Sequence, residues 1–250
     1  MKRLRIAAIL VPMFCLSPLF GGEKQILVSA ASSLTQAFGE IGKEFEKKHS
    51  VKVVFNFAAS GILLQQIANG APADVFASAD QESVDKGLEK NLFDVSTRKN
   101  FVKNVLVLIV PIDSKSDLKK ISDLKKETVQ KISFGNPATV PAGKYAREAL
   151  DTEGWDETLE KKWIPAENVR QVLDYVSRGE VDAGFVYKTD AILFKDKVKI
   201  AISDLKTKPI LYPAIAVAQS ANLSEAKLFL EFLSSPEAKK IFEQYHFGKP

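Results

Sequence analysis

Short apolar runs alternate along the chain with segments in which apolar residues recur every three or four positions. Residues 26–30 form an apolar run typical of a buried strand. The next segment, to about Lys48, has the spacing of one helix face, carried by Leu34, Phe38, Ile41 and Phe45. The pattern therefore predicts a strand followed directly by an amphipathic helix.

The same alternation continues beyond this first unit. A second strand is predicted at residues 51–57, followed by a short helix that ends at Asn69-Gly70, a pair typical of helix C-termini. A third strand at residues 74–78 leads to a helix that begins at Asp80. A strand-helix-strand-helix order predicts a parallel sheet whose ligand site lies beyond the carboxyl ends of the strands.

A second series of α/β elements begins at the apolar run 105–110. Its further elements are strands at 131–135 and 182–187 and helices at 142–152 and 167–177. The chain closes with strands at 198–202 and 210–217 and helices near 222–233 and 236–245. Because the last segments return to the first series, we expect an α/β protein of two lobes with a site between them. Their predicted bounds are residues 23–103 plus 206–250 for one lobe and 104–205 for the other.

Four strand-like runs end in a small, polar or proline-marked turn that opens a helix. The turns are residues 31–33, 59–61, 140–143 and 165–167. The first N–H groups of a helix have no intrahelical partner and carry a partial positive charge. Several helix starts at one place can hold an anion without any Lys or Arg. The chain is therefore predicted to bind an oxyanion.

The first two turns carry serines that suit such a site. Ser33 and Ser60 can each offer a main-chain N–H and a hydroxyl to one ligand oxygen. The alternative for Ser33 alone is an ordinary N-cap side chain. Gly61, next to Ser60, allows close approach of another group. Repetition of the arrangement favours binding.

The remaining turns offer main-chain groups. Pro141 suits the first helical position, which leaves the N–H groups of Ala142 and Gly143 directed forward. Val169 offers a main-chain N–H in the same way, whereas its side chain is expected in the core. Tyr187 ends a predicted strand, and either points its hydroxyl into a cleft or packs as a core tyrosine.

The N-terminus is typical of a secretory signal peptide. A basic start precedes the apolar stretch 6–20, which is shorter than a membrane span. The signal is assigned to residues 1–22, so the mature chain begins near Glu23. The single cysteine, Cys15, lies within this segment, and lipidation there is disfavoured because bulky Phe14 precedes it. The mature product is expected to be periplasmic or otherwise extracytoplasmic.

Composition excludes several classes of function. Loss of three basic residues with the signal leaves 32 basic and 31 acidic residues, so no global field attracts nucleic acid or a membrane. The mature chain has no cysteine for a disulfide or thiol chemistry. His49 and His246 are the two histidines, without metal-ligand spacing, and no G-x-S-x-G motif occurs. We therefore expect a binding protein and not an enzyme.

Five segments, in order along nearly all of the mature chain, resemble the molybdate-binding proteins of bacterial ABC importers. They are residues 30–35 (AASSLT), 70–80 (GAPADVFASAD), 140–146 (VPAGKYA), 165–170 (PAENVR) and 184–187 (GFVY). The resemblance implies a two-lobed type II periplasmic binding fold, each lobe a mostly parallel sheet flanked by helices. It also implies that the lobes close on one tetrahedral dianion.

The resemblance implies a set of ligand contacts as well. They are Ser33 and Ser60 through N–H and hydroxyl, Ala142 and Val169 through N–H, and Tyr187 through its hydroxyl. Ser33 is chosen over the adjacent Ser32. No cofactor is implied besides the ligand, molybdate or tungstate, and the implied partners are an ABC permease and its ATPase. We expect a monomer, and within the same class another oxyanion such as sulfate is the alternative ligand.

Overall fold

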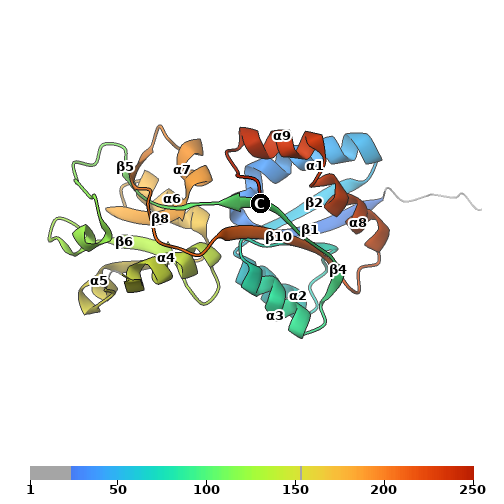
Figure 1. Cartoon of the computed structure of the whole chain (residues 1–250), viewed down its shortest axis with the longest axis horizontal. Coiled ribbons are helices and arrows are strands. Elements are labelled where there is room, and N and C mark those ends of the chain that lie inside the picture. Colours follow the sequence, from blue (N-terminus) through green and yellow to red (C-terminus); the bar gives the residue numbers. More distant parts are fainter. Residues whose placement is uncertain (1–23, 153) are drawn as a thin grey trace, which may run out of the picture.

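The computed structural model describes residues 24–152 and 154–250 and forms two five-stranded sheets placed side by side, each flanked by helices (Figure 1). The predicted signal peptide, residues 1–22, lies outside the described residues together with Cys15. Within the described part of the chain, no helix is both long and apolar enough to cross a bilayer.

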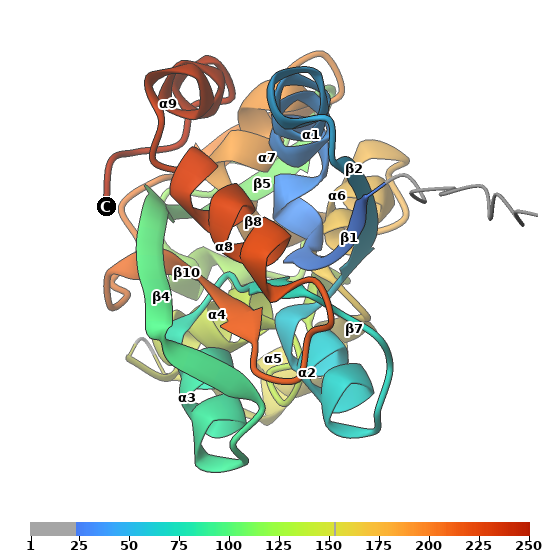
Figure 2. The same ribbon diagram turned by 90° about the vertical axis from the view of Figure 1, so that its right-hand side faces the viewer.

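Lobe I is defined here as the first sheet and its helices. The sheet has the order β2-β1-β3-β10-β4 and is formed by β1 (Gln25–Ala31), β2 (Lys52–Ala58), β3 (Val75–Ala77), β4 (Phe93–Asn104) and β10 (Ile210–Val217). Its helical elements are η1 (Ser32–Leu34), α1 (Thr35–His49), α2 (Ser60–Ala68), α3 (Gln81–Glu89), α8 (Leu223–Phe232) and α9 (Pro236–Gln244). Figures 1 and 2 show α1, α8 and α9 on one face of the sheet and α2 and α3 on the other.

Lobe II is built in the same way between the two passages of the chain. Its sheet has the order β7-β6-β8-β5-β9 and is formed by β5 (Leu106–Pro111), β6 (Ile132–Gly135), β7 (Trp163–Ala166), β8 (Ala183–Tyr187) and β9 (Val198–Ile202). Its helical elements are η2 (Ile121–Lys125), α4 (Pro141–Thr152), α5 (Glu157–Lys162), α6 (Val169–Ser177) and α7 (Lys188–Leu193).

Each sheet has four strands in one direction and one reversed strand. In lobe I, β1 is parallel to β2 and β3, whereas β10 is antiparallel to both of its neighbours. In lobe II, β5 is the reversed strand between β8 and β9, and β6 is parallel to both of its neighbours. The reversed strand is in each case the first strand after the chain enters that lobe. The prediction of mostly parallel sheets is confirmed, because four of the five strands in each sheet run in the same direction.

The two passages between the lobes lie side by side. β4 leads into β5, and β10 returns from lobe II to pair with β4 from Ile210 opposite Asn104 onward. The register shifts at Tyr212/Pro213, where proline supplies no N–H to the ladder. Both passages therefore meet at the inner edge of lobe I.

The strands that follow the predicted pattern pack their apolar side chains under the helices. Phe38 of α1 has ring centroids 5.7–6.3 Å from four other phenylalanines, Phe55, Phe101, Phe229 and Phe242. In lobe II, Phe134 stacks on Trp163 at 4.8 Å. Burial of one such side chain contributes about 1.5–3 kcal/mol. These two aromatic clusters hold the strand ends, and thus the turns beyond them, in fixed positions.

Candidate functional site

A small cavity lies where the carboxyl ends of the strands of the two sheets face each other. Its volume is about 10 Å³, against about 200 and 700 Å³ in two larger grooves that open beside it. Its lining comes from both lobes: Ala31, Ser32, Ser33, Ala58, Ala59, Ser60, Ala79, Val140, Pro141, Ala142, Val169 and Tyr187. All five residues predicted for the site, and Ser32, are thus brought together. None of the lining residues is charged.

The starts of three α-helices border this cavity. α2 begins at Ser60, α4 at Pro141 and α6 at Val169. The main-chain N–H groups in these first turns have no acceptor within their own helix. Asn168, the N-cap of α6, accepts hydrogen bonds from the N–H groups of the two residues after Val169, so this cap does not occupy the Val169 N–H. The prediction that Pro141 takes the first helical position is confirmed.

The serine side chains do not cap their helices. The N-cap residues of η1 and α2 are Ala31 and Ala59, and neither start has a side-chain cap bond. The N-cap alternative for Ser33 was therefore wrong. Its hydroxyl forms a 2.9 Å hydrogen bond with the Tyr212 hydroxyl. The hydroxyl of Ser60 accepts a 3.0 Å hydrogen bond from the Ala79 N–H, which leaves its own hydrogen available to donate.

Tyr187 occupies the lobe II side of the cavity. Only 1% of it is exposed, and no group in the described residues forms a hydrogen bond with its hydroxyl. Burial raises the pKa of Tyr187 well above 10, so the hydroxyl keeps its proton at neutral pH. A buried hydroxyl without a partner is rare and costly. Tyr187 both lines the cavity and packs in the buried core, so the two alternatives are combined in this residue.

Arg170 follows the α6 start and connects the two lobes. Its Nε lies 2.9 Å from Oδ1 of Asp190, although the two groups are not aligned as a hydrogen bond. A terminal guanidinium nitrogen donates to Oε1 of Gln36 in lobe I at 2.5 Å. Burial raises the pKa of the fully buried Asp190 to about 6, and the Arg170 charge offsets part of that rise. The guanidinium is thus neutralised within lobe II and does not line the cavity.

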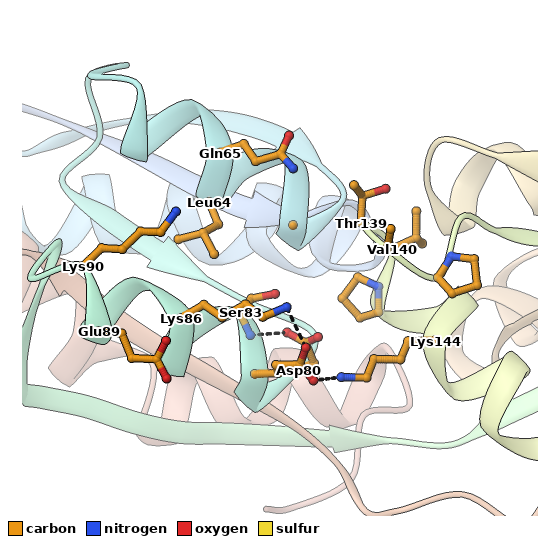
Figure 3. A pocket seen from close by; sticks show the side chains of 15 residues that line it. Leu64, Gln65, Asp80, Ser83, Lys86, Glu89, Lys90, Thr139, Val140 and Lys144 are labelled. Atoms are coloured by element: carbon orange, nitrogen blue, oxygen red, sulfur yellow. Dashed lines mark hydrogen bonds and ion pairs between the residues drawn. The ribbon is translucent and has the colours of Figure 1, made fainter.

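Two further contacts join the lobes on the α2 and α3 side. The Gly61 N–H donates to the Thr139 carbonyl at 3.0 Å, and a Cβ at Gly61 would lie 2.6 Å from that oxygen. Figure 3 shows Lys144 reaching from α4 across the neighbouring groove. Its ammonium group forms an ion pair with Glu82 of α3. These contacts and Arg170–Gln36 define a closed arrangement of the lobes. The close approach that Gly61 allows is made by the Thr139 carbonyl of lobe II.

The sequence offers no metal-ligand spacing around its two histidines, which lie away from the cavity lining. In residues 24–152 and 154–250, no group of three or more His, Cys, Asp or Glu side chains could hold a metal ion. His49 packs against Phe45 and Phe232, with ring centroids 4.8 and 5.8 Å away. It is a structural residue at the end of α1.

Sequence reasoning missed Tyr212 as part of the site. It lies in the predicted strand 210–217, it is fully buried, and its hydroxyl contacts Ser33, which is 179 positions away in the chain. The available signal was a hydroxyl in a run of otherwise apolar residues, which needs a hydrogen-bond partner when buried.

Two lobes joined by paired crossing strands, with an uncharged cavity among helix starts, define a two-lobed type II periplasmic binding protein. The chain belongs to the family of bacterial extracellular solute-binding proteins, whose sequence profile matches residues 26–248. Membership in a family of solute-binding proteins confirms that the chain is a binding protein and not an enzyme.

Individual relatives agree with this assignment. The chain is 39% identical over 235 residues to the molybdate-binding protein ModA of Escherichia coli (strain K12), covering 90% of this chain and 89% of the relative. A substrate-binding domain of a putative molybdenum ABC transporter from Clostridium difficile is 40% identical with a TM-score of 0.67, covering 90% and 99% of the two chains. The periplasmic molybdate-binding protein of Azotobacter vinelandii, at 23% identity and a TM-score of 0.80 over 90% and 99%, supports the fold.

Proposed function

We propose that the protein captures molybdate, or the equally shaped tungstate, in the cavity between its lobes and delivers it to an ABC importer. The observation that carries this proposal is the buried Tyr187 hydroxyl, which has no partner in the described residues and lines a small, uncharged cavity at three helix starts. An oxyanion supplies the acceptor that the hydroxyl lacks. The relatives from Escherichia coli and Clostridium difficile, named for molybdate and molybdenum, support this choice of oxyanion.

In this proposal the ion is held by donors from both lobes. The donors are the N–H and hydroxyl groups of Ser33 and Ser60, the N–H groups of Ala142 and Val169, and the Tyr187 hydroxyl. Charge-assisted hydrogen bonds to an anion are stronger than neutral ones, and the helix starts add their partial positive charge. A dianion can therefore be bound without a cationic side chain against it.

The donor set favours oxyanions without protons. Phosphate near neutral pH keeps a proton that needs an acceptor, and the proposed contacts are donors. Two acidic residues of the segment 70–80 are engaged elsewhere: Asp74 accepts from the Leu27 N–H, and Asp80 accepts from the Ser78 hydroxyl and the Ser83 N–H. Neither lines the cavity. A protonated ion would bury its proton unpaired, at a cost of about 1–3 kcal/mol.

The contacts between the lobes support a binding cycle in which the lobes open and close. The oxyanion first meets one lobe of an open form, and the other lobe then swings about the β4 and β10 passages until the Gly61–Thr139, Lys144–Glu82 and Arg170–Gln36 contacts form. The closed form docks on a permease driven by an ATPase. An exported, monomeric protein fits this role.

Calorimetric titration of the mature protein with molybdate, tungstate, sulfate and phosphate tests the proposal. We expect molybdate and tungstate to bind with similar affinity, sulfate far more weakly because the closed cavity cannot shrink around a smaller ion, and phosphate undetectably. Sulfate binding tighter than molybdate would assign a different oxyanion. No heat with any of the four would reject the oxyanion function.

A further inference from the structure

A series of hydrogen-bonded, buried polar side chains extends from Ser33 away from the cavity. The Tyr212 hydroxyl lies 2.9 Å from the Ser33 hydroxyl, and the Asn104 side-chain nitrogen lies 3.4 Å from the Tyr212 hydroxyl. The same nitrogen donates to the Thr189 hydroxyl at 3.0 Å. All four residues are more than nine-tenths buried. This series of hydrogen bonds joins both passages between the lobes, because Asn104 ends β4 and Tyr212 lies in β10.

The direction of the hydrogen bonds follows from the fixed donors at the far end. The Val105 N–H can only donate, and it donates to Oδ1 of Asn104 at 2.9 Å. The Asn104 side-chain nitrogen therefore faces Tyr212, and since that nitrogen can only donate, the Tyr212 hydroxyl is the acceptor. Of the two described residues that form hydrogen bonds with the Tyr212 hydroxyl, Ser33 is the one whose oxygen can accept the Tyr212 hydrogen, and this order satisfies both hydroxyls. As Ser33 accepts this bond, its own hydrogen is directed to the cavity.

The state of Tyr212 is compatible with this order. Burial raises the pKa of Tyr212 well above its usual value of 10, so the phenol keeps its hydrogen near neutral pH. Its ring is held from two sides, edge-on to Phe101 and Tyr187 at 6.3 and 5.8 Å. Neighbouring hydrogen bonds in a buried chain polarise one another, which strengthens the last donor in the series.

We infer that Tyr212 is a positioning residue that makes the Ser33 hydroxyl a hydrogen-bond donor and so selects oxyanions without protons. This inference rests on the proposed function. Ser60 is set as a donor by the Ala79 main-chain N–H, which side-chain substitution cannot remove. At Ser33 the group that fixes the direction of the hydroxyl is the side chain of Tyr212. Without the Tyr212 hydroxyl, the Ser33 oxygen can accept a proton from the ligand, and phosphate gains relative to molybdate.

The test is the Tyr212→Phe variant, which keeps the ring, measured by calorimetry with molybdate and with inorganic phosphate. We expect about a 3- to 10-fold loss of molybdate affinity and a smaller ratio of molybdate to phosphate affinity. In a Ser33→Ala background the same substitution should change molybdate affinity less than about twofold, because the residue acts through that hydroxyl. Tyr245→Phe, at the C-cap of α9 and outside the cavity lining, is the matched control.

The outcomes separate the inference from the function on which it rests. An equal loss in both backgrounds shows a general structural role and overturns the inference, as does an unchanged affinity in the Tyr212→Phe variant. A wild-type protein that fails to bind molybdate rejects the proposed function itself.

If Tyr212→Phe does not fold, Asn104→Asp is measured instead. Its carboxylate accepts the hydrogen of Tyr212, so the direction of the hydrogen bonds between Asn104, Tyr212 and Ser33 is reversed. We then expect a larger molybdate loss in the wild-type background than in Ser33→Ala. Equal losses in the two backgrounds contradict the inference.

Discussion

The two lobes present different kinds of donor to the same cavity. In lobe I, the Ser33 and Ser60 hydroxyls already have partners within that lobe, Tyr212 and the Ala79 N–H. In lobe II, the Tyr187 hydroxyl has no partner among the described residues. In the proposed function, lobe I is therefore organised for the ion in advance, whereas lobe II gains a missing partner when the ion is enclosed.

This difference links ligand binding to closure of the lobes. An unpartnered buried hydroxyl costs about 1–3 kcal/mol, and in the closed form without an ion Tyr187 bears that cost. Opening of the lobes would return the hydroxyl to water. The empty protein should therefore favour the open form, and the ion should favour the closed one, because it interacts differently with the two.

The largest effects are expected at the serines of lobe I. Ser33→Ala and Ser60→Ala should each weaken molybdate binding by about 1.5–3 kcal/mol, or about 10- to 150-fold, through loss of a charge-assisted hydrogen bond. Calorimetry below the melting temperature of each variant measures the change. Ser177→Ala is the control, because that hydroxyl bonds only to the Asp174 carbonyl at the end of α6. Unchanged affinity in both serine variants would place the ion elsewhere.

A different result is expected at Tyr187 of lobe II. Tyr187→Phe should weaken molybdate binding, yet it should also raise the closed fraction of the empty protein, because the buried hydroxyl without a partner is gone. Relief of about 1–3 kcal/mol multiplies the closed-to-open ratio about 5- to 150-fold. Small-angle X-ray scattering of the empty proteins measures the radius of gyration, which should be smaller in this variant and unchanged in the serine variants. Equal values throughout contradict the contrast between the lobes.

Closure itself can be weakened at Gly61 without touching a proposed donor side chain. In Gly61→Ala the new Cβ meets the Thr139 carbonyl oxygen at 2.6 Å, so the lobes cannot approach as closely. Overpacking of this kind costs about 1–3 kcal/mol, and molybdate affinity should fall by about 5- to 150-fold. Gly39→Ala is a matched control, since nothing lies within 4 Å of its added Cβ. Similar affinities of the two variants would show that the contact is not needed.

The smallest expected effect concerns the pH dependence of stability in lobe II. The pKa of Asp190 is raised to about 6 from 3.8, mainly by burial, so the folded state holds this proton more tightly than the unfolded state. Its contribution to stability is complete below about pH 4 and is lost as the pH rises through 6. The melting temperature of the wild type relative to Asp190→Asn should therefore fall from pH 4 to pH 7. A difference that is constant, or that grows with pH, contradicts this assignment.

Much of the fold follows from the sequence because its strands are buried runs and its helices have one apolar face. β4 was missed because it lies at a sheet edge, with polar residues such as Ser96 and Arg98 outside and few apolar ones to mark it. A strand-like run before the turn at 165–167 was predicted, but β7 was given no bounds because it is four residues long and contains Pro165.

The predicted site residues come together because helix starts are local features that a sequence displays. Their partners are not local: Ser33 with Tyr212 and Gly61 with Thr139 depend on how the chain crosses between lobes. The turn at residues 59–61 indicated that something approaches closely, and only the fold identifies the Thr139 carbonyl. No periodicity could show that Tyr187 lacks a hydrogen-bond partner, which is a property of the assembled cavity.

The position of molybdenum in a crystal of the mature protein grown with molybdate tests whether the ion binds between the lobes. Anomalous diffraction locates the metal independently of the protein atoms. We expect one molybdenum peak inside the cavity, with the molybdate oxygens within hydrogen-bond distance of Ser33, Ser60 and Tyr187 and with the lobes closed. A peak in the neighbouring groove near Lys86 and Lys144, or closed lobes around an empty cavity, would contradict it.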